Sequence, residues 1–166
     1  MTRLIATFFF TGYLKPFSGT WGSAAAVLAA FGLYLLGGWM LVAALIPVAF
    51  GLGLWATARE TAGSANHDPS EIVIDEVAGQ WLALLPVLIG ASHAGHTGAD
   101  ALALWPGWVT AFVAFRFFDI LKPGPIGWAD RQHGPMGVML DDIFAGIAAA
   151  ATVALAAALW HGILGA

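Results

Sequence analysis

Acidic side chains at the ends of apolar stretches are the residues of this chain best suited to chemistry. They form two adjacent pairs, Asp75–Glu76 and Asp141–Asp142, and a single acid, Asp119. Carboxylates are costly to place in or beside a membrane, so those that occur there are usually functional. Complementing the positive ends of helices would need one acid for each helix, and two pairs exceed that need. The surplus of carboxylates over nearby cations therefore favours a bound divalent cation with oxygen ligands.

Basic residues accompany the acids between positions 116 and 131. Arg116, Asp119 and Lys122 recur every third residue, so they lie along one side of a helix that the following prolines must end. An Arg116–Asp119 ion pair with Lys122 reaching to the membrane surface would be a purely structural explanation. It does not account for Asp130 and Arg131, which crowd near the second acidic pair. A divalent metal with cationic helpers would suit a phosphate ester, and we favour this interpretation.

A loop rich in glycine and serine, KPFSGTWGS over residues 15–23, precedes the first long apolar stretch. Ser18 or Thr20 can cap the helix that begins here. Gly19 and Gly22 leave backbone N–H groups uncovered, so the positive helix end could also hold a phosphate. An ordinary helix cap and a phosphate site fit this loop equally well.

The composition indicates the kind of fold that must position these residues. Of the 166 residues, 60% are hydrophobic and 10% are charged, against about 25% charged in soluble domains. A mean hydropathy of +0.82, with 21 glycines and 8 tryptophans, is typical of a protein that crosses the membrane several times. The net charge of -4 argues against nucleic acid as a partner, and the absence of cysteine excludes thiolate chemistry. We predict one all-α integral-membrane domain over residues 1–166.

Charge-free runs predict a bundle of about five apolar helices, since about 20 apolar residues cross the hydrocarbon core. The longest run, residues 16–58, is divided by Gly37–Gly38 into a helical hairpin. The segment 3–15 is too short to span, so we expect a short helix that lies in the interface or packs beneath the bundle. The predicted spans are 21–36, 39–58, 75–91, 104–121 and 142–164.

Alternation of these spans places nearly every charge on one side of the membrane. All 6 basic residues and 9 of the 10 acids fall on that side, and Asp100 falls on the other. The positive-inside rule makes the charged side cytoplasmic and places the C-terminus outside. The molecule is thus expected to have one chemical face and one nearly blank face.

Small residues follow the acids at helical spacing. Asp75 and Gly79 share a helix face, and so do Asp142 and Gly146. Small residues let membrane helices approach closely, so these faces should meet neighbouring helices and the carboxylates should point into the bundle. The similarity of VIDEVAG and MLDDIFAG also hints at two helix starts that face each other.

Four blocks of this sequence resemble the bacterial phosphatidylglycerophosphatase A family and occur in the family's order. They are SGTWGS (18–23), EIVIDEVAG (71–79), FRFFDILKPGPI (115–126) and DRQHGPMGVMLDDIFAG (130–146). The resemblance covers about residues 10–150 and implies a helical bundle in the bacterial inner (cytoplasmic) membrane. It also implies a Mg²⁺-dependent phosphatase that converts phosphatidylglycerophosphate into phosphatidylglycerol on the cytoplasmic side.

Carried over position by position, the resemblance assigns roles to the polar residues of these blocks. The metal ligands would be Asp75, Glu76, Asp119, Asp141 and Asp142. The substrate phosphate would be bound by Arg116, Lys122 and Arg131, with Thr20 and Ser23 from the entry loop. The segment 63–70 does not align, so His67 and Asp68 receive no role.

Elimination agrees with metal-assisted attack by water, since the chain has no cysteine, no Asp-x-Asp-x-Thr stretch and no two-histidine, arginine-rich pattern. We expect water activated by the metal to attack in line while Lys122 and Arg131, with Arg116, offset the phosphate charge. Asp130 or His133 would protonate the leaving alkoxide. The acyl chains of the lipid would stay in the membrane between spans.

Two other functions fit the same composition. A transporter or channel subunit could use the acids as a cation or proton path, but it would need polar groups on both sides. On the outer side the sequence offers Asp100, His93, His96 and His161. A structural subunit of a phospholipid-synthesis assembly would use the acids merely to complement helix ends. Phosphate release that is lost on chelation would separate the enzyme from both, and nothing in the sequence predicts an oligomeric state.

Overall fold

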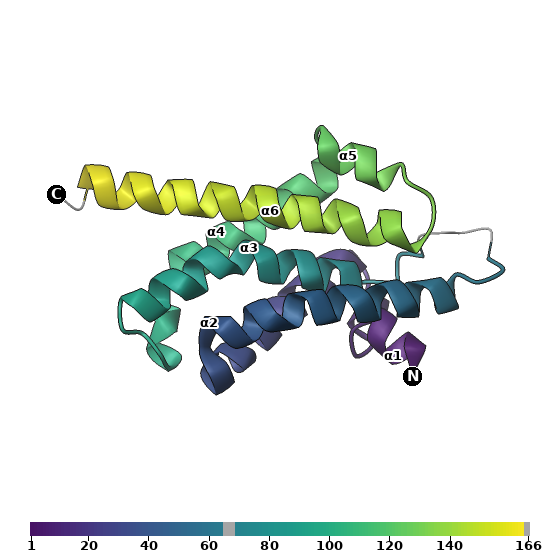
Figure 1. Cartoon of the computed structure of the whole chain (residues 1–166), viewed down its shortest axis with the longest axis horizontal. Coiled ribbons are helices and arrows are strands. Elements are labelled where there is room, and N and C mark those ends of the chain that lie inside the picture. Colours follow the sequence, from purple (N-terminus) through teal and green to yellow (C-terminus); the bar gives the residue numbers. More distant parts are fainter. Residues whose placement is uncertain (65–68, 165–166) are drawn as a thin grey trace.

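Helices make up every regular element of the computed structural model, which describes residues 1–64 and 69–164. Four helical segments are long and apolar enough to cross a membrane, and this confirms the predicted membrane bundle. The segment that ends with α4 starts at Ala99. Figure 1 shows them packed as one elongated bundle. The helices are α1 (Thr2–Ala6), α2 (Ser18–Glu60), α3 (Ile74–His93), α4 (Trp105–Leu121), α5 (Pro125–Asp130) and α6 (Pro135–Leu159), with short helical turns η1 (Thr11–Tyr13), η2 (Ala99–Leu104) and η3 (Trp160–Leu164).

Helix α2 is a hairpin of two helices, as the glycine pair predicted. Gly38 has φ 66° and ψ -169°, a conformation that in practice only glycine adopts, and it breaks the helix. The two ends of α2 therefore lie at the same end of the molecule. Ser18 Oγ there donates to the carbonyl of Ser70 (2.5 Å), and Glu60 Oε1 accepts from Thr2 Oγ1 (2.6 Å). With α3, α4 and α6, the two halves of α2 make the five apolar segments that the charge-free runs indicate.

Helix α6 begins earlier than the predicted span, at Pro135 and not at Asp142. Pro135 suits the first position of a helix, where no N–H is needed, and it starts a turn that the hydropathy pattern does not reveal. The first turn of α6 contains no acid, whereas the first turn of α3 contains Asp75 and Glu76. The Asp141–Asp142 pair therefore cannot be explained as a complement to the N-terminal dipole of α6.

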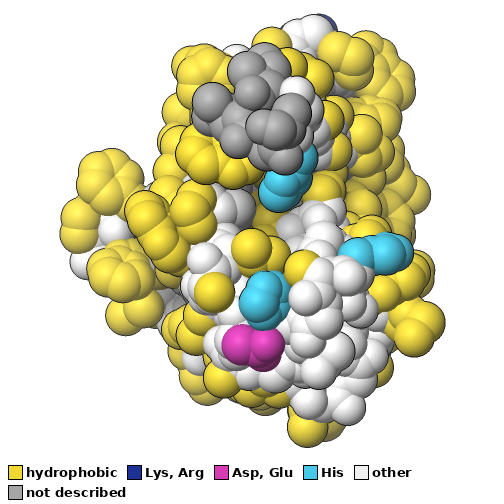
Figure 2. All heavy atoms as spheres, turned by 90° about the vertical axis from the view of Figure 1, so that its left-hand side faces the viewer, with side chains coloured by type: hydrophobic (Ala, Val, Ile, Leu, Met, Phe, Trp, Pro, Cys, Tyr) yellow, Lys and Arg dark blue, Asp and Glu magenta, His cyan; other side chains and the backbone are white. Residues whose placement is uncertain are grey.

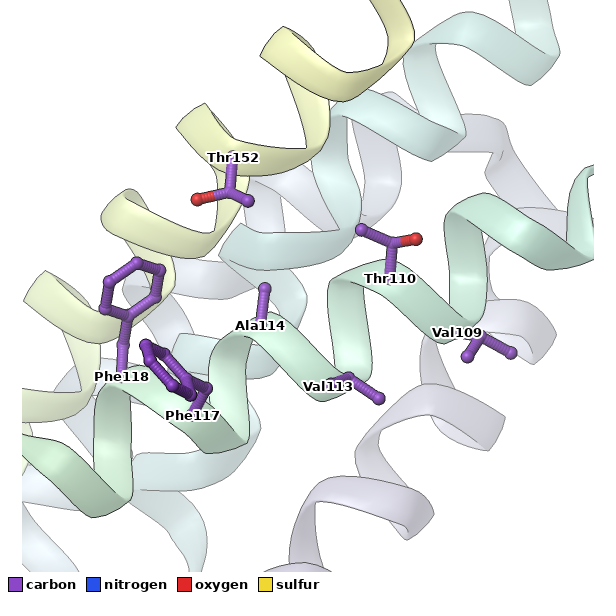
Figure 3. Close-up of a pocket in the computed structure, with 7 residues that line it drawn as sticks. All are labelled: Val109, Thr110, Val113, Ala114, Phe117, Phe118 and Thr152. Carbon is purple, nitrogen blue, oxygen red and sulfur yellow. The ribbon is translucent and has the colours of Figure 1, made fainter. Parts of the chain in front are cut away.

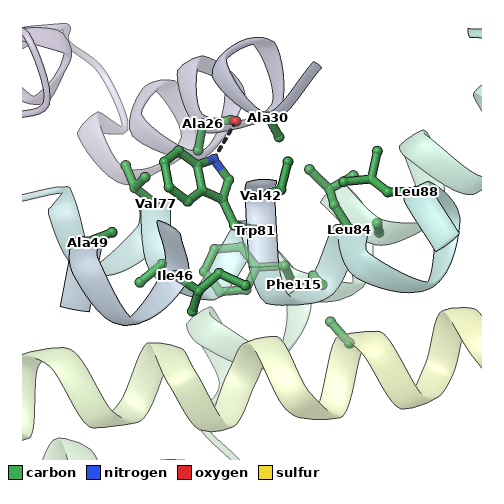
Figure 4. Packing of buried hydrophobic residues seen from close by; sticks show 14 of the residues in the cluster. Ala26, Ala30, Val42, Ile46, Ala49, Val77, Trp81, Leu84, Leu88 and Phe115 are labelled. Atoms are coloured by element: carbon green, nitrogen blue, oxygen red, sulfur yellow. Dashed lines mark hydrogen bonds between the residues drawn. The ribbon is translucent and has the colours of Figure 1, made fainter. Parts of the chain in front are cut away.

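Helix α3 lies at the centre of the bundle and is the most buried of the spanning helices. Its Trp81 packs among Ala26, Val42 and Ile46 from the two halves of α2, as Figure 4 shows. The Trp81 indole N–H donates to the carbonyl of Ala26 at 2.9 Å, so the ring is buried without an unpaired donor. This core fixes the position of α3, and hence of the acids at its start.

The two ends of the bundle differ in charge as predicted. At the end where α2 and α4 finish and α3 begins, Arg3 pairs with Glu60, and the backbone N–H of Val73 donates to Ala6, so α1 packs beneath the bundle. Figure 2 views the opposite end, where histidines and a carboxylate appear and arginine and lysine are nearly absent. There His96 Nδ1 lies 3.0 Å from Asp100 Oδ2.

Candidate active site

A polar pocket of about 480 Å³ opens at the charged end of the bundle. It lies where α2, α3 and α6 begin and α4 ends, so four elements that are distant in the sequence contribute to it. Five carboxylates and two cations line it: Asp75, Glu76, Asp119, Asp141, Asp142, Arg116 and Lys122. Thr20 and Gly19 line the side formed by the start of α2.

The carboxylates form two groups that share Asp142. One group is Asp75, Glu76 and Asp142, and the other is Asp119, Asp141 and Asp142. Within each group, one ligand oxygen from each residue lies within 4.8 Å of the others. Asp142 belongs to both groups, and it is 2% exposed, so its carboxylate is shielded from solvent. The predicted pairs on α3 and α6 thus meet in space.

Close packing of α3 against α6 brings the two pairs together. A side chain at Gly146 would collide with the backbone of Gly79, and one at Gly79 would lie 2.5 Å from the carbonyl oxygen of Asp142. Only glycine at both positions permits this approach of the two backbones. The acid-to-glycine spacing on each helix then places Asp75 beside Asp142, as the small-residue pattern predicted.

The Arg116 side chain lies between the acids and the start of α2 and contacts both. It pairs with Asp119 on its own helix, and its Nη1 lies 3.8 Å from Glu76 Oε1. The same nitrogen donates to Ser23 Oγ at 3.4 Å, and that hydroxyl donates to the carbonyl of Gly19 at 2.8 Å. A side chain at Gly19 would collide with the Glu76 carboxylate. Glycine there allows the start of α2 to reach the site, and Ser23 helps to orient Arg116.

Lys122 closes the pocket at the end of α4. It caps the helix in a left-handed conformation (φ 46°), and its Nζ donates to Asp141 Oδ2 at 2.7 Å and also to Asp130. Burial acts to lower the pKa of Lys122, but the hydrogen bonds and negative charges of Asp130 and Asp141 outweigh it and raise the pKa above its usual value. Lys122 therefore keeps its positive charge over the whole neutral range.

The carboxylate oxygens of the pocket are suitable ligands for a hard divalent cation. The five carboxylates of the pocket exceed its two cations, and Asp141 Oδ1 and Glu76 Oε2 are buried without a hydrogen-bond partner among the described residues. Such oxygens are costly to leave unsatisfied, and Mg²⁺ and similar ions are bound by oxygen ligands of this type. The residues at the site are therefore chemically suited to one or two ions of this class.

The structure does not bring every predicted site residue to the pocket. Ser23 lies behind Arg116, and Asp130 is exposed and reaches the site through Lys122. Arg131 and His133 are exposed and do not line the pocket. His67 and Asp68 lie outside the described residues.

Some residues of the site were not predicted from the sequence. Ile120 and Ser70 line the pocket without any local motif that distinguishes them. Gln80, one turn after Glu76 on α3, does not line the pocket but is fully buried, and neither its side-chain nitrogen nor its oxygen has a hydrogen-bond partner among the described residues. A polar amide inside an apolar span was a signal that could have marked this position.

Comparisons with known proteins agree with the resemblance in the sequence blocks. The model of the family described as phosphatidylglycerophosphatase A matches residues 4–157. A phosphatidylglycerophosphatase A of Haemophilus influenzae is 34% identical over 91% of this chain and 85% of its own length. One of Escherichia coli is 33% identical over 89% of this chain and 78% of its own.

A third relative carries a different name. A putative phosphatidylinositol-3-phosphatase of Bacteroides thetaiotaomicron is 33% identical over 92% of this chain and 91% of its own length. No solved structure matches the chain significantly.

Proposed function

This chain belongs to the phosphatidylglycerophosphatase A family, and we propose that its polar pocket hydrolyses the terminal phosphate of phosphatidylglycerophosphate with the help of bound Mg²⁺. The products are phosphatidylglycerol and inorganic phosphate. The observation that carries the proposal is the meeting of two carboxylate groups at Asp142, beside Arg116 and Lys122, at one end of a membrane bundle.

The two carboxylate groups are the ligands that we assign to Mg²⁺. Asp75, Glu76 and Asp142 would hold one ion, and Asp119 and Asp141 would complete a second site with Asp142. When bound, Mg²⁺ polarises the phosphoryl oxygens and lowers the pKa of water. The acid surplus of the pocket supports this assignment, since it calls for added positive charge.

The cations and the start of α2 are placed to bind the phosphate. Arg116 is held by Ser23 and Asp119, and Lys122 is held by Asp130 and Asp141, so both charges are oriented before the substrate arrives. Gly19 and Thr20 line the pocket at the start of α2, and the backbone N–H of Gly19 and the hydroxyl of Thr20 are additional donors for phosphoryl oxygens.

The reaction needs two proton transfers. As the oxygen of water forms its bond to phosphorus and the bond to the glycerol oxygen breaks, a pocket carboxylate accepts the proton of the water. Asp130, at the rim, is the negatively charged partner of Lys122. We therefore assign the protonation of the leaving alkoxide to His133, which is exposed in the connection between α5 and α6.

The charge asymmetry supports a cytoplasmic active site in the bacterial inner membrane. The basic residues that pair with acids in the structure, Arg3, Arg116 and Lys122, are all at the pocket end. By the positive-inside rule this end faces the cytoplasm. The phosphate of a lipid in the inner leaflet would then lie at the depth of the pocket.

A phosphate-release assay on the purified protein in detergent tests the proposal. Wild-type protein should release phosphate from phosphatidylglycerophosphate with Mg²⁺, lose this activity in EDTA and regain it when Mg²⁺ is restored. Phosphatidic acid and phosphatidylinositol 3-phosphate belong in the substrate panel, the latter because of the Bacteroides relative's name. Cation flux in proteoliposomes without phosphate release would instead favour a transporter, which the comparisons do not support.

A further inference from the structure

A second hollow, which we call the α4/α6 groove, runs along the outside of the bundle between α4 and α6. It has a volume of about 420 Å³. Figure 3 shows Thr110 and Ala114 of α4 pointing toward α6, Thr152 of α6 across from them, and Phe117 and Phe118 toward the end where α4 finishes. Val109 and Val113 complete its lining.

The lining of the groove is apolar in effect. None of its residues is charged, and the two hydroxyls are already used within their own helices. Thr110 Oγ1 donates to the carbonyl of Pro106 at 2.7 Å, and Thr152 Oγ1 donates to the carbonyl of Ala148 at 2.9 Å. The groove therefore offers water no free hydrogen-bond donor, and a hydrocarbon is its best-suited occupant.

The groove and the polar pocket are lined by residues of the same two helices, α4 and α6. On α4, Ile120 of the pocket comes three residues after Phe117 of the groove, so the two share a helix face, and Ile120 is 66% exposed. On α6, Asp141 and Thr152 are eleven residues apart, about three turns, so they share a helix face.

The groove has the direction and length of an extended hydrocarbon chain. From Val109 to Phe118 it follows α4 for about 14 Å at 1.5 Å per residue. Val113 is 57% exposed and Phe117 54%, within a helix long and apolar enough to span the membrane, so both face lipid. The groove thus begins beside the proposed phosphate site and leads into the membrane, which is how a phosphate ester of a diacyl lipid is arranged.

We propose that the α4/α6 groove binds one acyl chain of the lipid substrate while the phosphate of the same molecule lies in the polar pocket. This inference rests on the proposed function. It assigns selection between diacyl-lipid phosphates and water-soluble phosphate esters to Phe117, Val113 and Thr152, because Arg116 and Lys122 of the polar pocket would bind the phosphate of either class.

Filling the groove tests this assignment. Thr152→Trp and Val113→Trp place an indole in it, and Val48→Trp places one on the outward face of α2, where Val48 is 49% exposed. For long-chain phosphatidylglycerophosphate the groove variants should lower kcat/KM about 10-fold, mainly through KM. For a short-chain dibutyryl analogue they should stay within about 2-fold of wild type, and Val48→Trp should stay there for both substrates.

Unchanged kinetics of both groove variants on the long-chain lipid would overturn the acyl-chain assignment. If wild-type protein released phosphate from neither substrate, the proposed function itself would fail. The two failures are therefore separable in one set of assays.

Photolabelling provides a readout that does not depend on turnover. A phosphatidylglycerophosphate with a diazirine in one acyl chain should label residues 109–118 or the vicinity of Thr152 in wild-type protein. Excess unlabelled phosphatidylglycerophosphate should prevent labelling, and phosphatidylcholine should not. Equal displacement by phosphatidylcholine would show a groove for bulk lipid, and disulfide-linked dimers of a Thr152→Cys variant would show a second copy there; either result would overturn the inference.

Discussion

Asp142 is the carboxylate on which both acidic groups depend. It is 2% exposed, shares one group with Asp75 and the other with Asp141, and lies among other carboxylates. A buried carboxylate in such surroundings destabilises the protein when no cation offsets its charge. We therefore expect Asp142, which contributes to both proposed ion sites, to lower the stability of the folded protein when no ion is bound.

Replacing Asp142 with asparagine should separate stability from activity. Asp142→Asn is expected to lower phosphate release by on the order of 10³-fold, because it removes a ligand from both groups. In EDTA the variant should unfold at a higher temperature than wild type, since one buried negative charge is gone. Thermal unfolding with and without Mg²⁺ checks this, with Asp100→Asn at the opposite end as the control. Near-normal turnover by Asp142→Asn would contradict the assigned site.

Lys122 provides a second test, through its charge. Lys122→Met should raise KM for the lipid about 10- to 100-fold, because Asp141 loses its cation and the phosphate loses a partner. Lys122→Arg should recover part of the loss, and Lys15→Met, an exposed lysine of the same end, should have no effect. Steady-state kinetics on micellar substrate measure the difference, and equal effects of the Lys15 and Lys122 variants would argue for a nonspecific role of charge.

The raised pKa of Lys122 predicts a direction for pH dependence. A group whose pKa is higher in the folded protein contributes its full stability below its unfolded value and loses it as the pH rises through the folded value. The stabilising contribution of Lys122 should therefore be constant through neutral pH and decline only in strongly alkaline solution. The difference in unfolding temperature between wild type and Lys122→Met, followed from pH 6 upward, should be flat at first and then shrink.

The contact between α3 and α6 determines whether the acids meet. Gly79 and Gly146 are packed backbone against backbone, and no other residue fits either position without moving a helix. The acidic groups are therefore a consequence of helix packing about one turn deeper in the bundle.

A single methyl group should be enough to disturb this contact. Gly146→Ala is expected to destabilise the protein by about 1 to 3 kcal/mol through overpacking and to lower activity by moving Asp142 away from Asp75. Gly90→Ala on α3 has nothing within 4 Å of the added methyl, so it should be neutral or stabilising by about 0.5 to 1 kcal/mol. Chemical denaturation in detergent and phosphate release measure both effects, and equal stability of the two variants would refute the packing argument.

The whole molecule is an asymmetric membrane bundle with its polar pocket at one end. The opposite end carries the loop between α3 and η2, where the Tyr34 hydroxyl donates to the carbonyl of His96 at 2.5 Å. Because all described charged contacts except His96–Asp100 lie at the pocket end, the orientation of the bundle determines which leaflet supplies the substrate.

The absence of cysteine from the chain allows a direct test of orientation. Thr97→Cys and Ala62→Cys place one exposed thiol at each end of the bundle. In spheroplasts, a membrane-impermeant maleimide should label Thr97→Cys at once and Ala62→Cys only after the membrane is opened. The reverse pattern would place the pocket on the outer side of the inner membrane.

The membrane class, the helical hairpin, the charged end and the acids of the site could be predicted from the amino-acid sequence. These properties depend on composition and on spacing within one helix. The Gly37–Gly38 break, the Asp75 to Gly79 spacing and the clustering of bases can be seen without knowing which helices are neighbours. The same local patterns carried the family resemblance.

Other features depend on how helices from distant parts of the chain cross and rotate against each other. The sharing of Asp142 between two carboxylate groups, the support of Arg116 by Ser23 and the exposed position of Arg131 could not be predicted from spacing alone. The α4/α6 groove is also of this kind, because it lies between helices that contact each other through residues far apart in sequence. The spacing of residues in the sequence determines which side of a helix a residue occupies. What that side faces is determined only by how the helices pack.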